Sequence, residues 1–535
     1  MKKIFLIIAG ILFLTVPLSV PVFAISYNSI PVIVNGKANI ASYHVARLMG
    51  GINTAVATLG STTATLVVDD PETLTASLTV PSNISLIIIQ GGSITKAGTA
   101  TLTINGPFSA GNYQVFSGFN PGDITFGWQS HYAIINPLWF GATGNGTTDD
   151  SQAMNEAATS CSHYLQTYYG CTVFTPTGLY YLAHPILGHN GVSWHGITGD
   201  GSAVHGTQFL LKSGIPAFDL SAGGGNANYR DFLIDGNSII ANEVGFLVGG
   251  TTAPVSGAGQ LYIKDVTLST LDKAIDMQNT QQVWVSDSQM LYDNYGVYHQ
   301  SFNGGYSGDV HIKDCYISNN NEYGLYLVGD MFNVSIDDSV IQINPSGDLY
   351  TTATALNLTG NHFEDGGYIY NSVTLLSGAG SGIISGNIWN TAHYANDIYV
   401  YGANTGNIEI MANKFRGTLF VNATSETSNI DIFPTKGDTS ASFSLLGSQE
   451  RLYNQWGILP SSISVGAPPN FGWTNTNPYA VQACIRGGTV SEIDLGPNSA
   501  HITNTGAISG CFFLPPLSYI LITDSAAPTM EVWPQ

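Results

Sequence analysis

The chain has 535 residues, more than one hydrophobic core usually holds, which predicts two or three domains. Its 15 lysines and arginines stand against 36 aspartates and glutamates, and the formal net charge of −21 argues against nucleic acid and anionic membranes as partners. Only 10% of residues are charged, whereas 11% are aromatic and 61 are glycine, a composition typical of strands joined by tight turns.

Residues 1–24 have the pattern of a secretory signal peptide. Two lysines precede the apolar run Ile4–Val16, and Ala24 ends a stretch that suits signal peptidase. We expect a mature chain that begins at Ile25, is secreted or held at the cell surface, and does not cross a membrane. No later stretch has the ~18 to 20 uninterrupted apolar residues that a membrane-spanning helix needs.

Export makes the five cysteines interpretable, because disulfides persist in an oxidising compartment. Cys161 and Cys171 are ten residues apart, and Cys484 and Cys511 flank a turn-rich stretch near the C-terminus. The sequence predicts one disulfide within each pair. Cys315 is left over and, within an apolar pattern, is expected to be a buried free thiol. None of the spacings resembles a zinc site.

Residues 25–136 are predicted to be a small β-rich region. Within it, residues 61–127 carry short alternating strands broken by glycine and asparagine, which we interpret as extra β-coils or a small β-domain. The stretch that follows, "WFGATGNGTTDDSQAMNEAA" (Trp139–Ala158), runs from a glycine-rich loop into an amphipathic helix that begins near Asp149, Asp150 and Ser151. No lysine follows the glycines, so this is not a phosphate-binding loop.

A repeat of about 24 residues follows, in octets that start 22 to 27 residues apart. Each octet is apolar at its first and third places, has Asp, Gly or Ala at the fifth, and is bulky at the eighth. The octets begin at Leu261, Val283, Val310, Val334, Leu356, Gly382 and Ile408. Strand-like alternation at this period predicts a parallel β-solenoid, in which each coil adds a strand about 4.8 Å above the last. The helix near Asp149 is then expected to cover the open strand edge at the end of this solenoid.

The chain resembles the pectate-lyase-like right-handed parallel β-helix superfamily, in its rhamnogalacturonase/epimerase-type branch. "FGATGNGTTDDSQAMNEA" resembles the run that precedes the cap helix there, and "GLYYLAHPIL…GVSWHGITGDGSAVHGTQFLL" is similar to its first coils. The resemblance covers residues 137–433 and implies an all-β fold. The superfamily includes lyases, glycosidases, epimerases, phage tailspikes and surface proteins, so it implies no single activity. After residue 433 the coil pattern stops, and residues 434–535 are predicted to be a compact antiparallel β-domain.

Two outward-facing places of the octets carry the candidate binding site. Because successive side chains of a strand point to opposite faces, those at places one and three face the interior and those at places two and four face outward. On successive coils these outward places hold Tyr262, Trp284, His311, Lys264, Lys313 and Asp337. Aromatic side chains present apolar surface to sugar rings, and lysine pairs with a uronate carboxylate. We therefore assign Tyr262, Trp284 and Lys264 to the binding of an acidic polysaccharide. An exposed stripe covered by another segment is the alternative.

The candidate catalytic residues lie on the same coils: Lys313, His311, Asp337, Asp314 and Asp287. A lyase would use Lys313 or His311 as the base that removes the proton α to a uronate. Aspartate recurs at the fifth place of the octets. Such residues commonly bond to the backbone of turns. Alternatively, carboxyl groups one or two coils apart would be about 5 or 10 Å from each other, which are separations that glycosidases use. Further polar groups beside turns are His299, Glu322, His362, Glu364 and Asp365.

The family's catalytic motifs are incomplete in this chain. Asp337-Asp338 is the one acidic pair that matches, and no R-I-K is present. The only arginine in the repeat is Arg230, which lies in a looser upstream copy of the octet that begins at Ala227. No metal site is predicted, and Ca²⁺ stays open as a cofactor without a motif. We expect a polysaccharide lyase or glycoside hydrolase, with a non-catalytic glycan-binding surface, adhesion or tailspike-like protein as the alternative. The oligomeric state, including a trimer, is left open.

Overall fold

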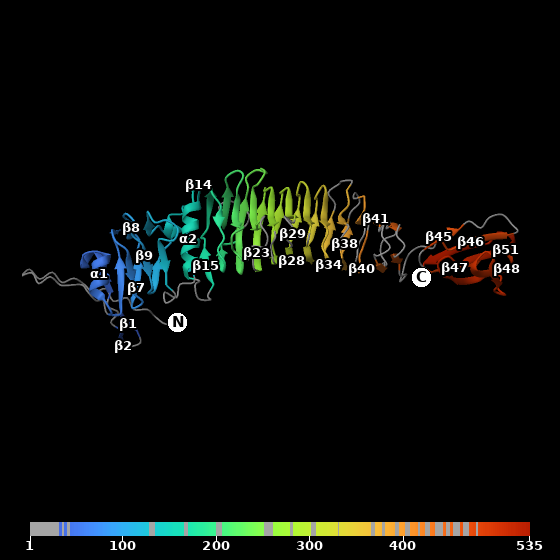
Figure 1. Cartoon of the computed structure of the whole chain (residues 1–535), viewed down its shortest axis with the longest axis horizontal. Coiled ribbons are helices and arrows are strands. Elements are labelled where there is room, and N and C mark those ends of the chain that lie inside the picture. The colour runs from blue at the N-terminus through green and yellow to red at the C-terminus, as the bar shows by residue number, and fades with distance from the viewer. Residues whose placement is uncertain are drawn as a thin grey trace, which may run out of the picture.

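The computed structural model describes residues 43–534 and, upstream of them, a hairpin of β1 (Val32–Val34) and β2 (Lys37–Asn39). Within 43–534 the segments that are not described are 128–133, 165–169, 200–205, 251–259, 279–281, 301–306, 330, 365–369, 377–379, 391–394, 402–406, 416–417, 423–428, 434–441, 446–449, 453–460, 464–469 and 478–479. The predicted signal peptide, residues 1–24, lies outside the described residues. Figure 1 shows an elongated molecule whose strands stack along one axis.

The N-terminal region is a short stack of three-sided coils. It begins with β3 (Tyr43–Val45), the 3-10 turn η1 (Ala46–Met49) and helix α1 (Ile52–Leu59). Three parallel sheets follow. The first contains β4 (Ala64–Val68), β7 (Ile84–Ile88) and β10 (Phe108–Ala110). The second contains β5 (Pro71–Leu74), β8 (Ser93–Lys96) and β11 (Phe116–Ser117), and the third contains β6 (Leu78–Val80), β9 (Leu102–Ile104) and β12 (Ile124–Phe126). Of the two interpretations of this region, extra β-coils is the correct one.

The main solenoid has two long parallel sheets in the described part of the chain. The first sheet consists of β13 (Ile134–Ile135), β14 (Asn145–Asp149), β15 (Cys171–Phe174), β16 (Gly178–Leu182), β18 (Val192–His195), β19 (Thr207–Leu211), β21 (Ala227–Asp235), β23 (Gln260–Ser269), β25 (Gln282–Ser286), β26 (Gln289–Leu291), β28 (Ser307–Lys313), β29 (Tyr316–Ser318), β31 (Met331–Asp337), β32 (Val340–Gln342), β34 (Ala355–Thr359), β35 (His362–Glu364), β37 (Ser381–Ser385), β38 (Ile388–Asn390), β40 (Asn407–Met411), β42 (Asn429–Phe433) and β44 (Glu450–Leu452). The second sheet consists of β17 (Ile186–Leu187), β20 (Pro216–Leu220), β22 (Val244–Gly249), β24 (Lys273–Gln278), β27 (Tyr295–Gln300), β30 (Tyr323–Val328), β33 (Gly347–Thr351), β36 (Val373–Leu375), β39 (Ile398–Tyr401), β41 (Thr418–Asn422) and β43 (Ser442–Leu445). The parallel β-helix predicted from the repeat is confirmed, but its strands pair as far as Leu452 rather than ending at residue 433.

The third places of the octets form one interior row. Ile263, Val285, Ile312, Ile336, Leu358, Ile384 and Ile410 are register partners on successive strands, and each is at most 2% exposed. This confirms the predicted inward face, because a slip of one residue in any strand would turn its apolar side chains outward.

The fifth place marks a bend between paired strands such as β25 and β26. Its residues have a left-handed backbone, with φ of 52° at Asp265, 51° at Asp287, 52° at Asp314, 50° at Asp338, 68° at Gly360, 68° at Gly386 and 54° at Ala412. Aspartate and glycine tolerate this conformation better than most residues do. The repeat of aspartate and glycine at this place is therefore explained by the backbone of the bend.

The sixth place of the last three octets forms a buried ladder of asparagines inside the solenoid, made of Asn361, Asn387 and Asn413. The side-chain oxygen of Asn387 accepts hydrogen bonds from the backbone and side-chain nitrogens of Asn361 at 2.9 and 3.0 Å. Asn387 in turn donates from both of its nitrogens to the side-chain oxygen of Asn413, at 3.0 Å each, and its Nδ2 donates to the carbonyl of Leu358 at 2.8 Å. These asparagines thus bond both to the backbone and to one another from coil to coil.

Helix α2 (Ser151–Tyr164) lies between the N-terminal coils and the main solenoid (Figure 1). It contacts β12 and the 3-10 turn η3 (Pro137–Phe140) upstream, and β13, β15 and β17 downstream. As expected, the helix covers the first strands of the main solenoid, but the N-terminal coils lie on its other side, and the buried residues from Ala46 to Phe415 form one continuous core. The helix is buried around most of its circumference, as suits a helix between two layers.

The aspartates before α2 hold the glycine-rich loop. Asp150 accepts hydrogen bonds from the amides of Thr143 and Gly144 at 2.7 and 3.2 Å, and Asp149 accepts one from the Ser151 amide at 3.0 Å. These bonds satisfy backbone donors that would otherwise lack partners where the helix begins. The structural interpretation of this motif is confirmed.

Beyond the coils, a second hydrophobic core lies in a pair of antiparallel sheets. One consists of β45 (Ser461–Ile463), β52 (Thr529–Pro534), β47 (Val481–Arg486) and β50 (Gly510–Leu514), and the other of β46 (Asn470–Thr474), β51 (Tyr519–Ala526), β48 (Thr489–Asn498) and β49 (His501–Asn504).

Both predicted disulfides are present: Cys161 with Cys171, from α2 to β15, and Cys484 with Cys511, from β47 to β50. Cys315 is buried and free, as predicted.

Candidate functional site

The predicted aromatic stripe forms on the first sheet. Tyr262, Trp284 and His311 are register partners on β23, β25 and β28. The rings of Tyr262 and Trp284 stack with centroids 6.1 Å apart, and those of Trp284 and His311 with centroids 3.7 Å apart. Each ring therefore covers a face of the next. The stripe presents mainly ring edges to the outside, which limits the stacking of sugars on ring faces.

The charged residues predicted beside the stripe lie in the next outward row. The Nζ of Lys264 is 3.5 Å from a carboxylate oxygen of Asp287, so this lysine already has an anionic neighbour. Asp337 accepts a hydrogen bond from the hydroxyl of Ser335 at 2.8 Å. Lys313 is exposed and forms no salt bridge with any described residue. The structure thus brings the predicted residues together on one surface.

The proton chemistry of this surface centres on His311. Partial burial lowers the pKa of His311, although Asp309 and Asp337 act in the opposite direction. A lowered pKa keeps the imidazole neutral near pH 7, the form that accepts a proton. The other two candidate acids, Asp287 and Asp314, stand at the left-handed bends, where the backbone explains their presence.

The second sheet carries a tyrosine surface that the sequence analysis missed. Tyr298, Tyr326 and Tyr350 are register partners on β27, β30 and β33, with ring centroids 5.2 and 5.3 Å apart and planes within 8° of parallel. A second row beside it holds Tyr295 and Tyr323, whose centroids are 6.4 Å apart. The signal was available, because "YGVY" at Tyr295–Tyr298 recurs as "YGLY" 28 residues later.

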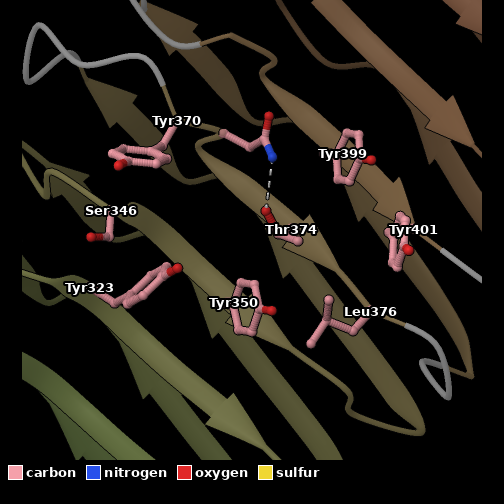
Figure 2. Close-up of a pocket in the computed structure, with 9 residues that line it drawn as sticks. Tyr323, Ser346, Tyr350, Tyr370, Thr374, Leu376, Tyr399 and Tyr401 are labelled. Atoms are coloured by element: carbon pink, nitrogen blue, oxygen red, sulfur yellow. Dashed lines mark hydrogen bonds between the residues drawn. The ribbon is translucent and has the colours of Figure 1, made fainter.

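A cleft of about 340 Å³ opens in this tyrosine surface. Figure 2 shows Thr374 at its centre, with the rings of Tyr350 and Tyr399 on opposite sides. Leu376 and Tyr401 lie at one end of the cleft. The remaining lining residues are Tyr323, Ser346, Tyr370 and Asn371. Tyr370 and Tyr401 are 53% and 50% exposed, so the cleft is open to large molecules.

The phenols of this surface stay protonated over the physiological range. Burial raises the pKa of Tyr323 and of Tyr295 to about 12, and burial together with Tyr326 raises the pKa of Tyr350. A protonated phenol both donates and accepts hydrogen bonds. The surface therefore offers neutral polar groups beside apolar rings, which is the combination that sugar hydroxyls and sugar ring faces need.

Of the polar groups that we predicted beside turns, only Glu322 reaches this cleft. It accepts a hydrogen bond at 3.1 Å from the hydroxyl of Ser346, which lines the cleft. His299 is fully buried, and burial lowers its pKa to about 4, so it stays neutral inside the solenoid. His362 and Glu364 lie on β35 of the first sheet, and Asp365 is outside the described residues.

Two negative findings concern the described part of the chain. No group of three or more His, Cys, Asp or Glu side chains there is arranged to hold a metal ion. No helix there has both the length and the apolar character needed to span a bilayer.

The comparisons with known proteins agree with the fold. Residues 134–215 match the family described as "Rhamnogalacturonase A/epimerase, pectate lyase-like". This segment contains α2 and the first strands of both long sheets. A search of curated proteins finds no match.

Solved structures with a similar architecture come from several functional classes. The A-module of the Azotobacter vinelandii mannuronan C-5 epimerase AlgE6 is 16% identical, with 60% of this chain and 98% of that chain covered and a TM-score of 0.35. PfbA, a surface adhesin of Streptococcus pneumoniae, is 11% identical, with coverage of 59% and 91% and a TM-score of 0.33. The tailspike protein of Acinetobacter baumannii phage AM24 is 11% identical, with coverage of 75% and 83% and a TM-score of 0.36.

The family match includes the glycine-rich loop and α2, and parallel coils continue from there through two long sheets. The opening motif, the coil period and the interior rows are those expected from the resemblance. Residues 134–215 therefore match this family, and the coils that follow have the parallel β-helix architecture that the resemblance implies.

Proposed function

We propose that this protein binds a polysaccharide along the tyrosine surface of the second sheet. The observation that carries the proposal is the open cleft around Thr374, which combines phenol rings with neutral hydroxyl and amide groups. Aromatic rings pack against the apolar faces of sugars, and the neutral polar groups bond to sugar hydroxyls. The two disulfides favour a site of action outside the cytoplasm.

The lining of the cleft supports binding rather than cleavage. Glycoside hydrolysis needs two carboxyl groups that flank the bond, and elimination needs a base beside the acidic carbon. The described lining contains neither a carboxylate nor a histidine nor a lysine, and Glu322 reaches it only through Ser346. A binding protein needs none of these groups.

Cleavage of an acidic polysaccharide is the second candidate, and the cluster on the first sheet supports it. His311, with a lowered pKa, lies in the row beside the exposed Lys313. Either residue is a candidate base, with Asp337, Asp314 and Asp287 as the acids on the same coils. Release of reducing ends or unsaturated products from a polysaccharide would show this activity, and its absence under binding conditions would leave a binding protein.

Replacing both Tyr350 and Tyr401 by alanine should weaken polysaccharide binding by about a hundredfold, since each lost ring removes about 1.4 kcal/mol of stacking and apolar contact. Trp284→Ala, which removes the central ring of the stripe on the first sheet, is the matched control and should bind as the unmodified protein does. The measurement is affinity electrophoresis in gels that contain soluble polysaccharides. The reverse pattern, with loss only in Trp284→Ala, would place binding on the first sheet instead.

Binding to the tyrosine surface should be nearly independent of pH between about pH 6 and pH 9. Burial raises the pKa of Tyr323 to about 12 and also raises the pKa of Tyr350, so these two phenols remain protonated throughout this range. A site built on His311 and an acidic glycan would instead change its affinity as the imidazole titrates. Dissociation constants measured by calorimetry across the range would test this, and a change of more than about threefold would contradict it.

A further inference from the structure

The tyrosine row of the second sheet is interrupted at one position. Tyr298, Tyr326 and Tyr350 follow one another in register, Thr374 takes the next place on β36, and Tyr399 takes the place after it on β39. One face of the Tyr350 ring is covered by Tyr326. Its other face is turned toward the gap above Thr374, across which Tyr399 lies (Figure 2).

The width of this gap follows from the spacing of the strands. Two steps of about 4.8 Å separate the strands of Tyr350 and Tyr399 by about 9.6 Å. A ring in van der Waals contact with a phenol on each side, at about 3.5 to 4.0 Å, needs about 7 to 8 Å between the two phenols. The gap thus accommodates one additional ring and is too narrow for two.

We propose that this gap is a slot that holds a single neutral pyranose ring of the bound polysaccharide, stacked between Tyr350 and Tyr399. The proposal rests on the proposed function and goes further, because it names the position and the class of sugar. Thr374 is 7% exposed and forms the floor of the slot. Its hydroxyl accepts a hydrogen bond from the side-chain amide of Asn371 at 3.4 Å, so the floor is polar at its centre.

The charges around the slot favour a neutral sugar over a uronate. Every residue of the lining is uncharged, and Glu322 stands behind Ser346 at the edge. On the same sheet Lys273 has its Nζ 3.1 Å from Asp276 and 4.3 Å from the ring centre of Tyr298, three strands before the slot. It is therefore already engaged. The described lining contains no lysine or arginine, so a uronate in the slot would lack a cationic partner there, on a chain with a formal net charge of −21. This differs from the acidic glycan expected from Lys264 and Lys313.

The decisive variant fills the slot without removing a wall. Thr374→Tyr continues the row of rings and should weaken binding at least about tenfold, because the added phenol occupies the place of the sugar. Ile388→Tyr adds the same phenol at a 42% exposed position of the first sheet, away from the slot, and should bind as the unmodified protein does. Tyr350→Ala removes one wall and should weaken binding about tenfold. Thermal unfolding by circular dichroism establishes that each variant is folded.

The probes are dextran, galactomannan and xyloglucan as neutral polysaccharides and polygalacturonate as the anionic one, each cast into a gel for affinity electrophoresis. Retardation of the unmodified protein by a neutral probe, lost in Thr374→Tyr and kept in Ile388→Tyr, is the expected result. Normal retardation of folded Thr374→Tyr would overturn the slot and leave the proposed function standing. If Thr374→Tyr is unfolded, normal retardation of Tyr350→Ala overturns the slot. Retardation by polygalacturonate alone would overturn the neutral sugar, and no retardation by any probe would overturn both the slot and the proposed function.

Discussion

Replacing Ala157 by aspartate should lower the free energy of unfolding by about 3 to 5 kcal/mol, the range observed when an unpaired charge is left inside a protein. Ala157 lies on α2 and is 0% exposed, between the N-terminal coils and the main solenoid. The same environment already acts on its neighbour Glu156, because burial raises the pKa of that carboxyl to about 7. A carboxylate at position 157 would either stay buried beside Glu156 or push the N-terminal coils and the main solenoid apart.

Gln152→Asp is the matched control, because it adds the same charge to an exposed position in the first turn of α2, where the helix dipole favours it. It removes the hydrogen bond from Gln152 to Glu156 and should cost at most about 1 kcal/mol. Thermal unfolding followed by circular dichroism compares the two variants. Equal midpoints would mean that α2 does not join the two stacks into one core.

Asn387→Ala should be the most damaging single change within the coils, with a local loss of about 3 kcal/mol or more. The truncation leaves the two nitrogens of Asn361 without the oxygen that they share and removes the donor to the Leu358 carbonyl. All of these groups are buried. Because each coil of a solenoid depends on its neighbours, the loss should spread along the stack rather than stay at one residue.

Asn390→Ala provides the comparison, since Asn390 is exposed on the neighbouring strand of the same coil and donates to Glu364 at 3.0 Å. Limited proteolysis and amide hydrogen exchange should show faster opening around residues 356–415 in Asn387→Ala and little change in Asn390→Ala. Indistinguishable exchange in the two variants would contradict a stabilising role for the ladder.

The sequence predicted the parts of the fold that repeat with the coil. The interior row through Ile312 and Ile336 recurs at the third place of each octet, and the ladder at Asn361 and Asn387 recurs at the sixth place of the last three octets, so local pattern and tertiary position coincide. The position of α2 was not predictable in the same way. Its residues show that it is amphipathic, but whether coils lie on one side of it or on both depends on the weaker repeat before residue 127.

The tyrosine surface was missed for a different reason. The octets mark only the first sheet, and the strands of the second sheet follow them at variable distances, so "YGVY" and "YGLY" do not align with the octet pattern. The cleft depends in addition on Thr374, which is notable only because its register partners Tyr350 and Tyr399 are aromatic. Register across 24 or 25 residues has to be known before a missing ring can be recognised.

Both disulfides close short loops, of 10 and 27 residues in sequence separation, and the only cysteine between residues 192 and 415, Cys315, is free. No covalent bond therefore links one coil to the next between residues 192 and 415. When a pulling force is applied from the C-terminal end, we expect such a stack to unfold one coil at a time. With 22 to 27 residues in each coil, every released coil adds about 80 Å of extended chain. The polypeptide can thus lengthen stepwise under load while the coils nearer the N-terminus, held to α2 by the Cys161–Cys171 bridge, stay folded.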